Sequence, residues 1–107
     1  MEQICLIVEG RSDKLRLQPI VGSNVHILCT NGTMDEDALI ELIEPYEYTQ
    51  LVTFFDRDKS GNYLRKQMQR VFSEAKQLQL VAPYIEVAEA PIAILRSILS
   101  AAKIDLK

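Results

Sequence analysis

Three carboxylates in this sequence stand directly after runs of apolar residues. Glu9 follows residues 4–8, and Asp56 and Asp58 follow residues 51–55. Carboxylates placed close together repel one another, and a hard divalent cation relieves that repulsion. A site with only oxygen ligands suits Mg²⁺ or Mn²⁺ better than zinc. If the three side chains meet in the fold, we expect a divalent-metal site for phosphate chemistry.

The aspartate pair also has a plainer explanation. Asp and Glu fill 15 of the 107 positions, so an Asp-x-Asp pair also arises by chance. Asp35 and Asp37 form such a pair, which we interpret as the solvated first turn of a helix, where the helix dipole favours negative charge. Asp56 and Asp58 equally fit a turn and a helix N-cap. Their position after a strand, matched by that of Glu9, favours the metal site.

Glycines and cations lie close to the acidic motifs. Backbone at a glycine can approach a ligand closely, and Arg is suited to bidentate contact with phosphate oxygens. The residues expected to contact phosphate or nucleic acid are Gly10, Arg11, Lys14, Asn31, Gly32, Arg57, Lys59, Gly61 and Arg65. For the neighbouring Lys66, an ordinary charged surface is a serious alternative. In contrast, the acidic residues between positions 35 and 47 should repel a polyanion.

Four short apolar runs are the elements that must position these side chains. We predict strands at residues 4–8, 25–29, 51–55 and 84–87. The first three are almost continuously apolar, which is typical of parallel strands covered on both faces. Ligands of open parallel sheets bind beyond the carboxyl ends of the strands. The candidate site residues follow those ends in the sequence.

Helical patterns separate the predicted strands. Ser12 is a candidate N-cap for a first helix that Pro19 would end, and Thr33 with Glu36 matches a capping box for a second helix before Pro45. Apolar positions at helical spacing predict a third helix, with Leu64, Met68, Val71, Phe72, Ala75 and Leu78. A fourth helix is predicted with Pro91 in its first turn and with Ile92, Leu95, Ile98 and Leu99 facing the core. This alternation predicts an α/β, Rossmann-like three-layer domain with a mainly parallel four-stranded sheet. We expect residues 1–107 to form one domain.

Composition narrows the class of protein. The net charge of −3 argues against a protein that coats nucleic acid through charge alone. The N-terminus lacks a signal-peptide pattern, and no apolar run is long enough to span a membrane. We interpret Cys5 and Cys29 as reduced, buried thiols and expect a cytoplasmic protein without membrane contact. His26 lies alone in a predicted strand, so we expect a structural role for it.

The ordered set of motifs resembles the toprim (topoisomerase–primase) domain. Residues 4–10 resemble its opening motif, and Asp56-x-Asp58 after an apolar strand resembles its second motif. The similarity is greatest to small stand-alone toprim proteins and to the toprim part of ribosomal-RNA maturation nucleases. Further positions that match this group are Thr30, Asn31, Gly32, Gly61 and Arg65. The resemblance covers nearly the whole chain.

The toprim resemblance implies a role for each carboxylate. Asp56 and Asp58 would hold Mg²⁺, and Glu9 would be a general acid or base or a further metal ligand. The metal would offset negative charge that builds on a phosphoryl group. The implied activity is Mg²⁺-dependent phosphotransfer on nucleic acid, of the nuclease type, on structured RNA or DNA. A partner protein is a further expected ligand, because the chain is short and mildly acidic.

Two other functions compete with this one. A non-catalytic toprim module would use the same pocket to bind nucleic acid or protein, and the extra sequence of the maturation nucleases has no counterpart in these 107 residues. A phosphatase or receiver-like domain is the other candidate. However, the common aspartate phosphatases place Asp-x-Asp after their first strand, whereas here the pair follows the third. None of the four tyrosines has a context that marks it as a nucleophile.

Overall fold

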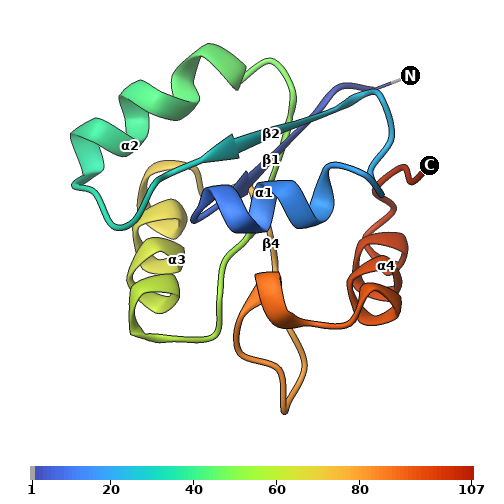
Figure 1. The fold of residues 1–107 in the computed structure, drawn as a ribbon. Helices are drawn as coiled ribbons and strands as arrows, with labels where there is room; N and C mark the ends of the chain where they lie inside the picture. Colours follow the sequence, from blue (N-terminus) through green and yellow to red (C-terminus); the bar gives the residue numbers. More distant parts are fainter. Residues whose placement is uncertain (1) are drawn as a thin grey trace.

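A computed structural model describes residues 2–107, in which strands and helices alternate along the chain (Figure 1). The elements are β1 (Ile4–Val8), α1 (Arg11–Leu17), β2 (Val25–Cys29), α2 (Glu36–Ile43), β3 (Gln50–Phe54), α3 (Lys59–Val71), β4 (Lys76–Leu78) and α4 (Ile92–Ala101). Two short 3-10 helices, Glu44–Tyr46 and Val87–Glu89, precede β3 and α4. The predicted alternation of strand and helix is confirmed.

The four strands form one parallel sheet in the order β2-β1-β3-β4. In its register, Val8 lies opposite Cys29 on β2, and Ile7 lies opposite Thr53 on β3. The carboxyl ends of β1, β2 and β3 therefore reach the same edge of the sheet. This register brings together the segments that carry the candidate site residues.

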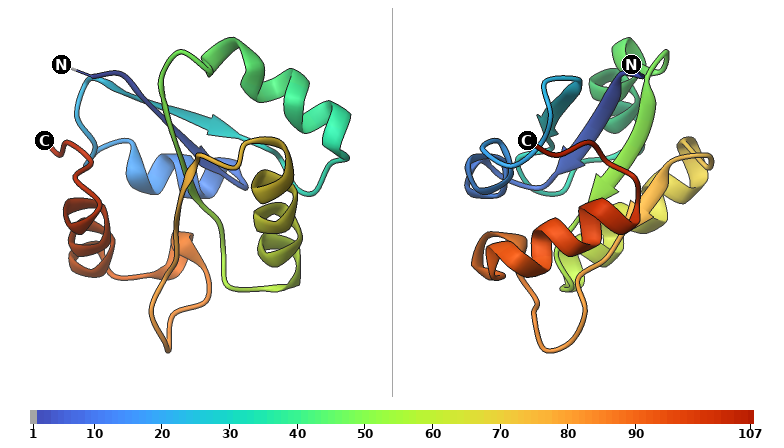
Figure 2. Two further views of the ribbon diagram at one scale, coloured as in Figure 1. Left: turned by 180° about the vertical axis from the view of Figure 1, so that it is seen from behind. Right: turned by 90° about the vertical axis from the view of Figure 1, so that its right-hand side faces the viewer.

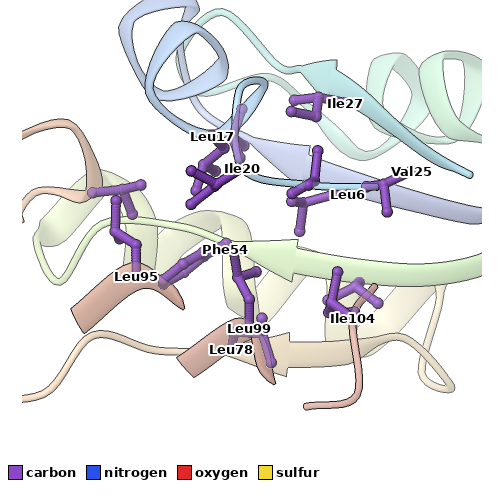
Figure 3. Packing of buried hydrophobic residues seen from close by; sticks show 14 of the residues in the cluster. Leu6, Leu17, Ile20, Val25, Ile27, Phe54, Leu78, Leu95, Leu99 and Ile104 are labelled. Carbon is purple, nitrogen blue, oxygen red and sulfur yellow. The ribbon is translucent and has the colours of Figure 1, made fainter. Parts of the chain in front are cut away.

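Helices cover both faces of the sheet, as two further views show (Figure 2). Alternate side chains of β1 point to opposite faces: Leu6 joins the core under α1 and α4, and Ile7 joins the core under α2 and α3. Figure 3 shows Leu6 and Phe54 in the first of these cores, together with Leu95 of α4. Burial on both faces explains why the sequence of the central strand β1 is continuously apolar. The predicted three-layer α/β architecture is confirmed.

The fourth predicted strand is wrong. The outermost strand beside β3 is β4, Lys76–Leu78, in which Lys76 pairs with Val52 of β3. Residues 84–87 lead instead into a 3-10 helix, and Ile85 is 53% exposed. The strand β4 has only three residues, of which one is buried, so it leaves no apolar run in the sequence.

The third predicted helix ends earlier than its apolar spacing indicates. The helix α3 stops at Val71, and Phe72, with φ −136° and ψ 64°, leaves the helical conformation. Ala75 lies in the turn that follows, and Leu78 is buried from β4. Both still pack inward, so their spacing continued the helical pattern by coincidence.

Three helix details also differ from the prediction. Ser12 lies exposed within α1, whose N-cap is Gly10. Thr33 does not cap α2, because Asp35 does so by accepting a hydrogen bond from the Ala38 N–H at 2.8 Å. Ile92, predicted to face the core, is 36% exposed. The strand β3 begins and ends one residue earlier than expected. Pro19 and Pro45 follow the ends of α1 and α2 as predicted, whereas Pro91 is the N-cap of α4 and lies just before its first turn.

The remaining expectations concern single residues and the membrane. Cys5 and Cys29 are free thiols, but only Cys5 is buried as predicted, whereas Cys29 is half-buried. Burial raises the pKa of Cys5 to about 12. His26 stacks on Tyr46, with ring centroids 4.8 Å apart and planes 15° apart, which fits a structural role. Within residues 2–107, no helix is long and apolar enough to cross a bilayer.

Candidate metal centre

Glu9, Asp56 and Asp58 meet at the carboxyl edge of the sheet. Each offers a carboxylate oxygen, and these atoms all lie within 4.8 Å of one another. Glu9 directly follows β1, whereas the two aspartates stand in the short connection between β3 and α3. All three side chains are half-buried. Parallel strand ends thus bring together side chains that are far apart in the sequence.

Hydrogen bonds hold the Glu9 carboxylate at both of its oxygens. Glu9 Oε1 accepts from the backbone N–H of Asp56 at 3.0 Å, and Oε2 accepts from the Ser60 hydroxyl at 3.2 Å. The first bond joins the end of β1 to the end of β3, and the second joins β1 to the first turn of α3. The side chain is therefore oriented before any ligand binds.

The two aspartates are each held by one oxygen. Asp56 Oδ1 accepts from the Val87 N–H at 2.8 Å, and Asp58 Oδ1 accepts from the Gly61 N–H at the same distance. Asp58 is the N-cap of α3, so the plainer interpretation of this residue is confirmed. In both aspartates the second carboxylate oxygen lies outside these bonds. That oxygen is suited to a cation.

The electrostatics of the site favour a positive ligand. Burial raises the pKa of Glu9, and the charges of Asp56 and Asp58 raise it further. Burial also raises the pKa of Asp56, with Asp58 adding to the rise, while the Val87 N–H and Arg65 oppose it. Ionising these carboxyl groups therefore costs free energy when no cation is bound, and a divalent cation would offset that cost.

Asp13 is a fourth carboxylate at this edge, which sequence reasoning missed. It is only 4% exposed, and its carboxylate accepts from the Gly10 N–H at 3.0 Å. Burial raises the pKa of Asp13, and the negative charge of Asp56 raises it further. Together with Glu9, Asn31 and Asp56 it lines a hollow of about 300 Å³. The available signal was its position three residues after Gly10, in the first turn of a helix that follows a strand.

The loop after β2, which was predicted to contribute to the site, lies beside the carboxylates. The backbone N–H groups of Asn31 and Gly32 donate to the Glu9 carbonyl oxygen at 2.7 and 3.3 Å. Both residues have positive φ, 59° and 102°. Gly10, Asn31 and Gly32 all line the hollow beside the carboxylates. The loop therefore positions Glu9 through its backbone.

Two of the predicted phosphate-binding arginines contact backbone carbonyls. Arg65 is half-buried and donates to the carbonyl oxygens of Phe55 at 3.3 Å and Asp56 at 3.1 Å. Burial lowers its pKa, although the nearby carboxylates oppose this change. Arg57 is exposed and donates to the Tyr84 carbonyl at 3.0 Å. Arg65 thus stabilises the connection that carries the two aspartates.

The other predicted cations surround the site. Arg11 and Lys59 are exposed at the starts of α1 and α3, and Lys14 is half-buried on α1. Burial raises the pKa of Cys29, at the end of β2, and the positive charges of Lys14 and Arg11 oppose that rise. These two cations therefore lie near the β2 end of the edge, and Lys59 lies at the α3 end.

Gly61 allows α3 to approach the site closely. A Cβ built at this position would lie 2.0 Å from the Asp56 carbonyl oxygen and 3.0 Å from Glu9 Oε1. The residue is buried, and its N–H caps Asp58. These are packing contacts within the protein, and the predicted contact of Gly61 with phosphate stays a prediction.

The chain is similar to two known proteins, one by sequence and one by structure as well. The sequence is 38% identical over 101 residues to the uncharacterized protein YusF of Bacillus subtilis (strain 168), a match that covers 94% of this chain and 69% of YusF. The fold matches the structure of a small TOPRIM domain protein from Bacillus stearothermophilus with a TM-score of 0.93 and 38% identity, over 100% of this chain and 91% of that one. No family model matches the sequence.

Substitution Gly61→Ala should destabilise the protein. In a helix without crowding, Gly to Ala usually stabilises by about 1 kcal/mol. Here the added methyl group must displace the Asp56 carbonyl, so we expect a loss of about 1–3 kcal/mol, as in other overpacked sites. Urea unfolding measures this change, with Gln69→Ala, an exposed position of α3, as the control. A stabilised Gly61→Ala variant would contradict the close approach.

The metal-free protein should lose stability as pH rises. The folded pKa values of Glu9, Asp13 and Asp56 lie above the ordinary carboxyl values. At pH values between the ordinary and the raised pKa values, the folded state therefore binds more protons than the unfolded state. The free energy of unfolding therefore falls as pH rises from the ordinary carboxyl pKa values through the raised ones. We expect Asp56→Asn to reduce this fall and to raise Tm at neutral pH by about 2–4 °C, or roughly 0.5 kcal/mol. Thermal unfolding in chelator over a pH series tests this, and an unchanged pH dependence would contradict it.

Proposed function

The chain belongs to the small toprim domain proteins, and from that membership we propose that it carries out Mg²⁺-dependent phosphotransfer on nucleic acid. We propose nuclease-type cleavage of structured RNA or DNA as the reaction, and we propose that residues 1–107 act as one toprim-like domain in it. The observation that carries the proposal is the convergence of Glu9, Asp56 and Asp58 within 4.8 Å at the sheet edge.

The donor set fits a hard divalent cation. All three candidate ligands are carboxylates, and such oxygen donors suit Mg²⁺ or Mn²⁺. Asp56 and Asp58 would hold the ion through the oxygens that their backbone hydrogen bonds leave unused. Glu9 would complete the site as a ligand or serve in proton transfer. The raised pKa values of Glu9 and Asp56 support the need for positive charge here.

The chain's own residues would position the substrate and transfer protons to or from it. A bound metal ion supplies stabilisation of the negative charge that develops on the phosphoryl oxygens. Glu9, with a pKa raised by burial, is suited to accept or deliver a proton. The hollow lined by Gly10, Asn31 and Gly32 has room beside the carboxylates for a phosphate group. Arg11 and Lys14 would add positive charge on the α1 side.

Binding partners and location form part of the same proposal. We propose nucleic acid as the main ligand, with a partner protein as a further candidate, because the chain is mildly acidic with a net charge of −3. The free thiols of Cys5 and Cys29 support a cytoplasmic location.

A non-catalytic binding module is the second candidate function. The observation that favours it is the engagement of Arg57 and Arg65 by backbone carbonyls. With two arginines occupied in this way, fewer cations are available to hold a substrate through its transition state. Such a module would still bind metal and nucleic acid, so turnover is the property that separates the two functions.

The double substitution Asp56→Asn with Asp58→Asn should remove metal binding. Loss of groups that only support metal ligands costs about 10–100-fold in affinity, so loss of two ligands should weaken Mg²⁺ or Mn²⁺ binding by roughly 100-fold or more. Isothermal titration calorimetry measures this effect. The matched control is Asp35→Asn with Asp37→Asn, the other Asp-x-Asp pair. Equal affinity in the site variant and the control would refute the metal centre.

Metal-dependent turnover should depend on Glu9. Labelled structured RNA and DNA are incubated with the protein in Mg²⁺ and in chelator, and the products are separated by size. We expect cleavage that chelator abolishes and that Glu9→Gln slows by about 10²–10⁴-fold, the usual contribution of a general acid or base. Intact metal binding without cleavage of any substrate in the panel would favour the binding module.

A further inference from the structure

Four exposed side chains form a line along one side of α3. Lys59, Tyr63, Lys66 and Arg70 are spaced by four, three and four residues, which at 3.6 residues per turn puts them within about 60° of one another around the helix. All four are exposed. We call this line the α3 stripe. We propose that the α3 stripe binds single-stranded nucleic acid next to the metal centre, with a base stacked on Tyr63 and phosphates on Lys59 and Lys66.

The α3 stripe begins at the candidate metal centre. Lys59 is the first residue of α3, and its neighbour Ser60 donates a hydrogen bond to Glu9 at 3.2 Å. Thr33, Lys59, Ser60 and Tyr63 line a hollow of about 460 Å³ on this side of the site. A strand held on the stripe would therefore lead directly to the carboxylates.

Tyr63 has the features of a stacking platform. It is 46% exposed although it is a large aromatic residue. Its hydroxyl accepts a hydrogen bond from Nε2 of the buried Gln67 at 3.1 Å, which holds the tip of the ring against α3. Among residues 2–107 the ring stack is between His26 and Tyr46, so Tyr63 has no aromatic partner there. An exposed, anchored ring is suited to stack with an unpaired base.

The charges around Tyr63 complement a phosphate backbone. In the part of the chain that the structure describes, the one salt bridge joins Arg70 to Glu36 of α2, so Lys59 and Lys66 have no acidic partner within ion-pair distance. The Arg70 pair also neutralises the acidic residue of α2 that lies beside the stripe. Other acids of α2, such as Asp37 and Glu41, are exposed and would repel a polyanion from that helix.

The dimensions of the α3 stripe favour a single strand over a duplex. Lys59 and Lys66 are seven residues apart, or about 10 Å along the helix axis. This length is short beside the ~34 Å turn of a DNA duplex. In addition, stacking on Tyr63 requires a base whose face is free, which a paired and stacked duplex does not offer. The stripe therefore fits a few nucleotides of an unpaired strand, and this inference rests on the proposed function for its placement beside the metal centre.

Fluorescence anisotropy with short labelled single strands and the matching duplex, in chelator, tests the proposal. We expect the protein to prefer the single strand, and Tyr63→Ala to weaken that binding by about 5- to 150-fold, the equivalent of one base stack of 1–3 kcal/mol. Tyr63→Phe keeps the ring but loses the hydrogen bond to Gln67, so its affinity should fall much less than that of Tyr63→Ala. Lys66→Gln should reduce the slope of log affinity against log salt by about 0.7, the value for one phosphate contact of a single strand.

Matched controls lie at the amino edge of the sheet, opposite the edge that carries the carboxylates. Tyr48 is 81% exposed and precedes β3, so it lies at the opposite edge of the sheet. Tyr48→Ala and Lys107→Gln should leave single-strand binding unchanged, and circular dichroism checks that each variant is folded. Equal affinities of Tyr63→Ala and Tyr48→Ala, equal affinity of the protein for strand and duplex, or no binding of either would overturn the proposal.

Failure of the α3 stripe can be distinguished from failure of the proposed function. If Asp56→Asn with Asp58→Asn loses metal binding but Tyr63→Ala binds single strands normally, the α3 stripe is refuted and the metal centre stands. If Tyr63→Ala loses single-strand binding but the unaltered protein shows no metal-dependent turnover, the stripe is supported and the phosphotransfer proposal fails.

Discussion

The hydrogen bond from the Asp56 N–H to Glu9 Oε1, 3.0 Å long, is the contact on which the arrangement of the site depends. It joins residues 47 positions apart, and it forms because the parallel register of β1 and β3 ends both strands at one edge. The Glu9 carbonyl meanwhile accepts from the loop after β2. Glu9 is therefore linked to the ends of both neighbouring strands, so the order of the central strands determines which side chains meet.

Bringing these carboxylates together opposes stability, and the surrounding backbone reduces the cost. Burial raises the pKa of Glu9, Asp13 and Asp56, which means that their charged forms are disfavoured in the folded protein. Backbone N–H groups of Gly10, Asp56 and Val87 donate to these same carboxylates and partly compensate. Groups held together against their mutual repulsion are typical of functional sites, where local stability is given up for binding.

Sequence reasoning succeeded where a strand leaves a nearly continuous apolar run in the sequence, and failed where it does not. The strands Ile4–Val8 and Val25–Cys29 were predicted with their observed bounds. The strand β4 has three residues with one buried, so no run marks it. Asp13 resembles an ordinary acidic residue in a first helical turn, because its burial arises from the 3-10 segment near Ala88, far away in the sequence. Similarly, the composition near Arg65 cannot reveal that its guanidinium contacts backbone carbonyls, because those contacts depend on how α3 packs.

Three parts of the surface of helix α3 make different contacts. Its first turn supports the carboxylates, since Asp58 caps it and Gly61 permits the close approach. Its inner face, with Leu64 and Met68, packs into the core against α2 and the sheet. Its outer face carries the exposed residues of the α3 stripe, among which Tyr63 accepts a hydrogen bond from Gln67 and Arg70 pairs with Glu36. Because the first turn fixes the helix relative to Glu9, the outer face has a defined position relative to the carboxylates, and a ligand bound there would reach them in one orientation.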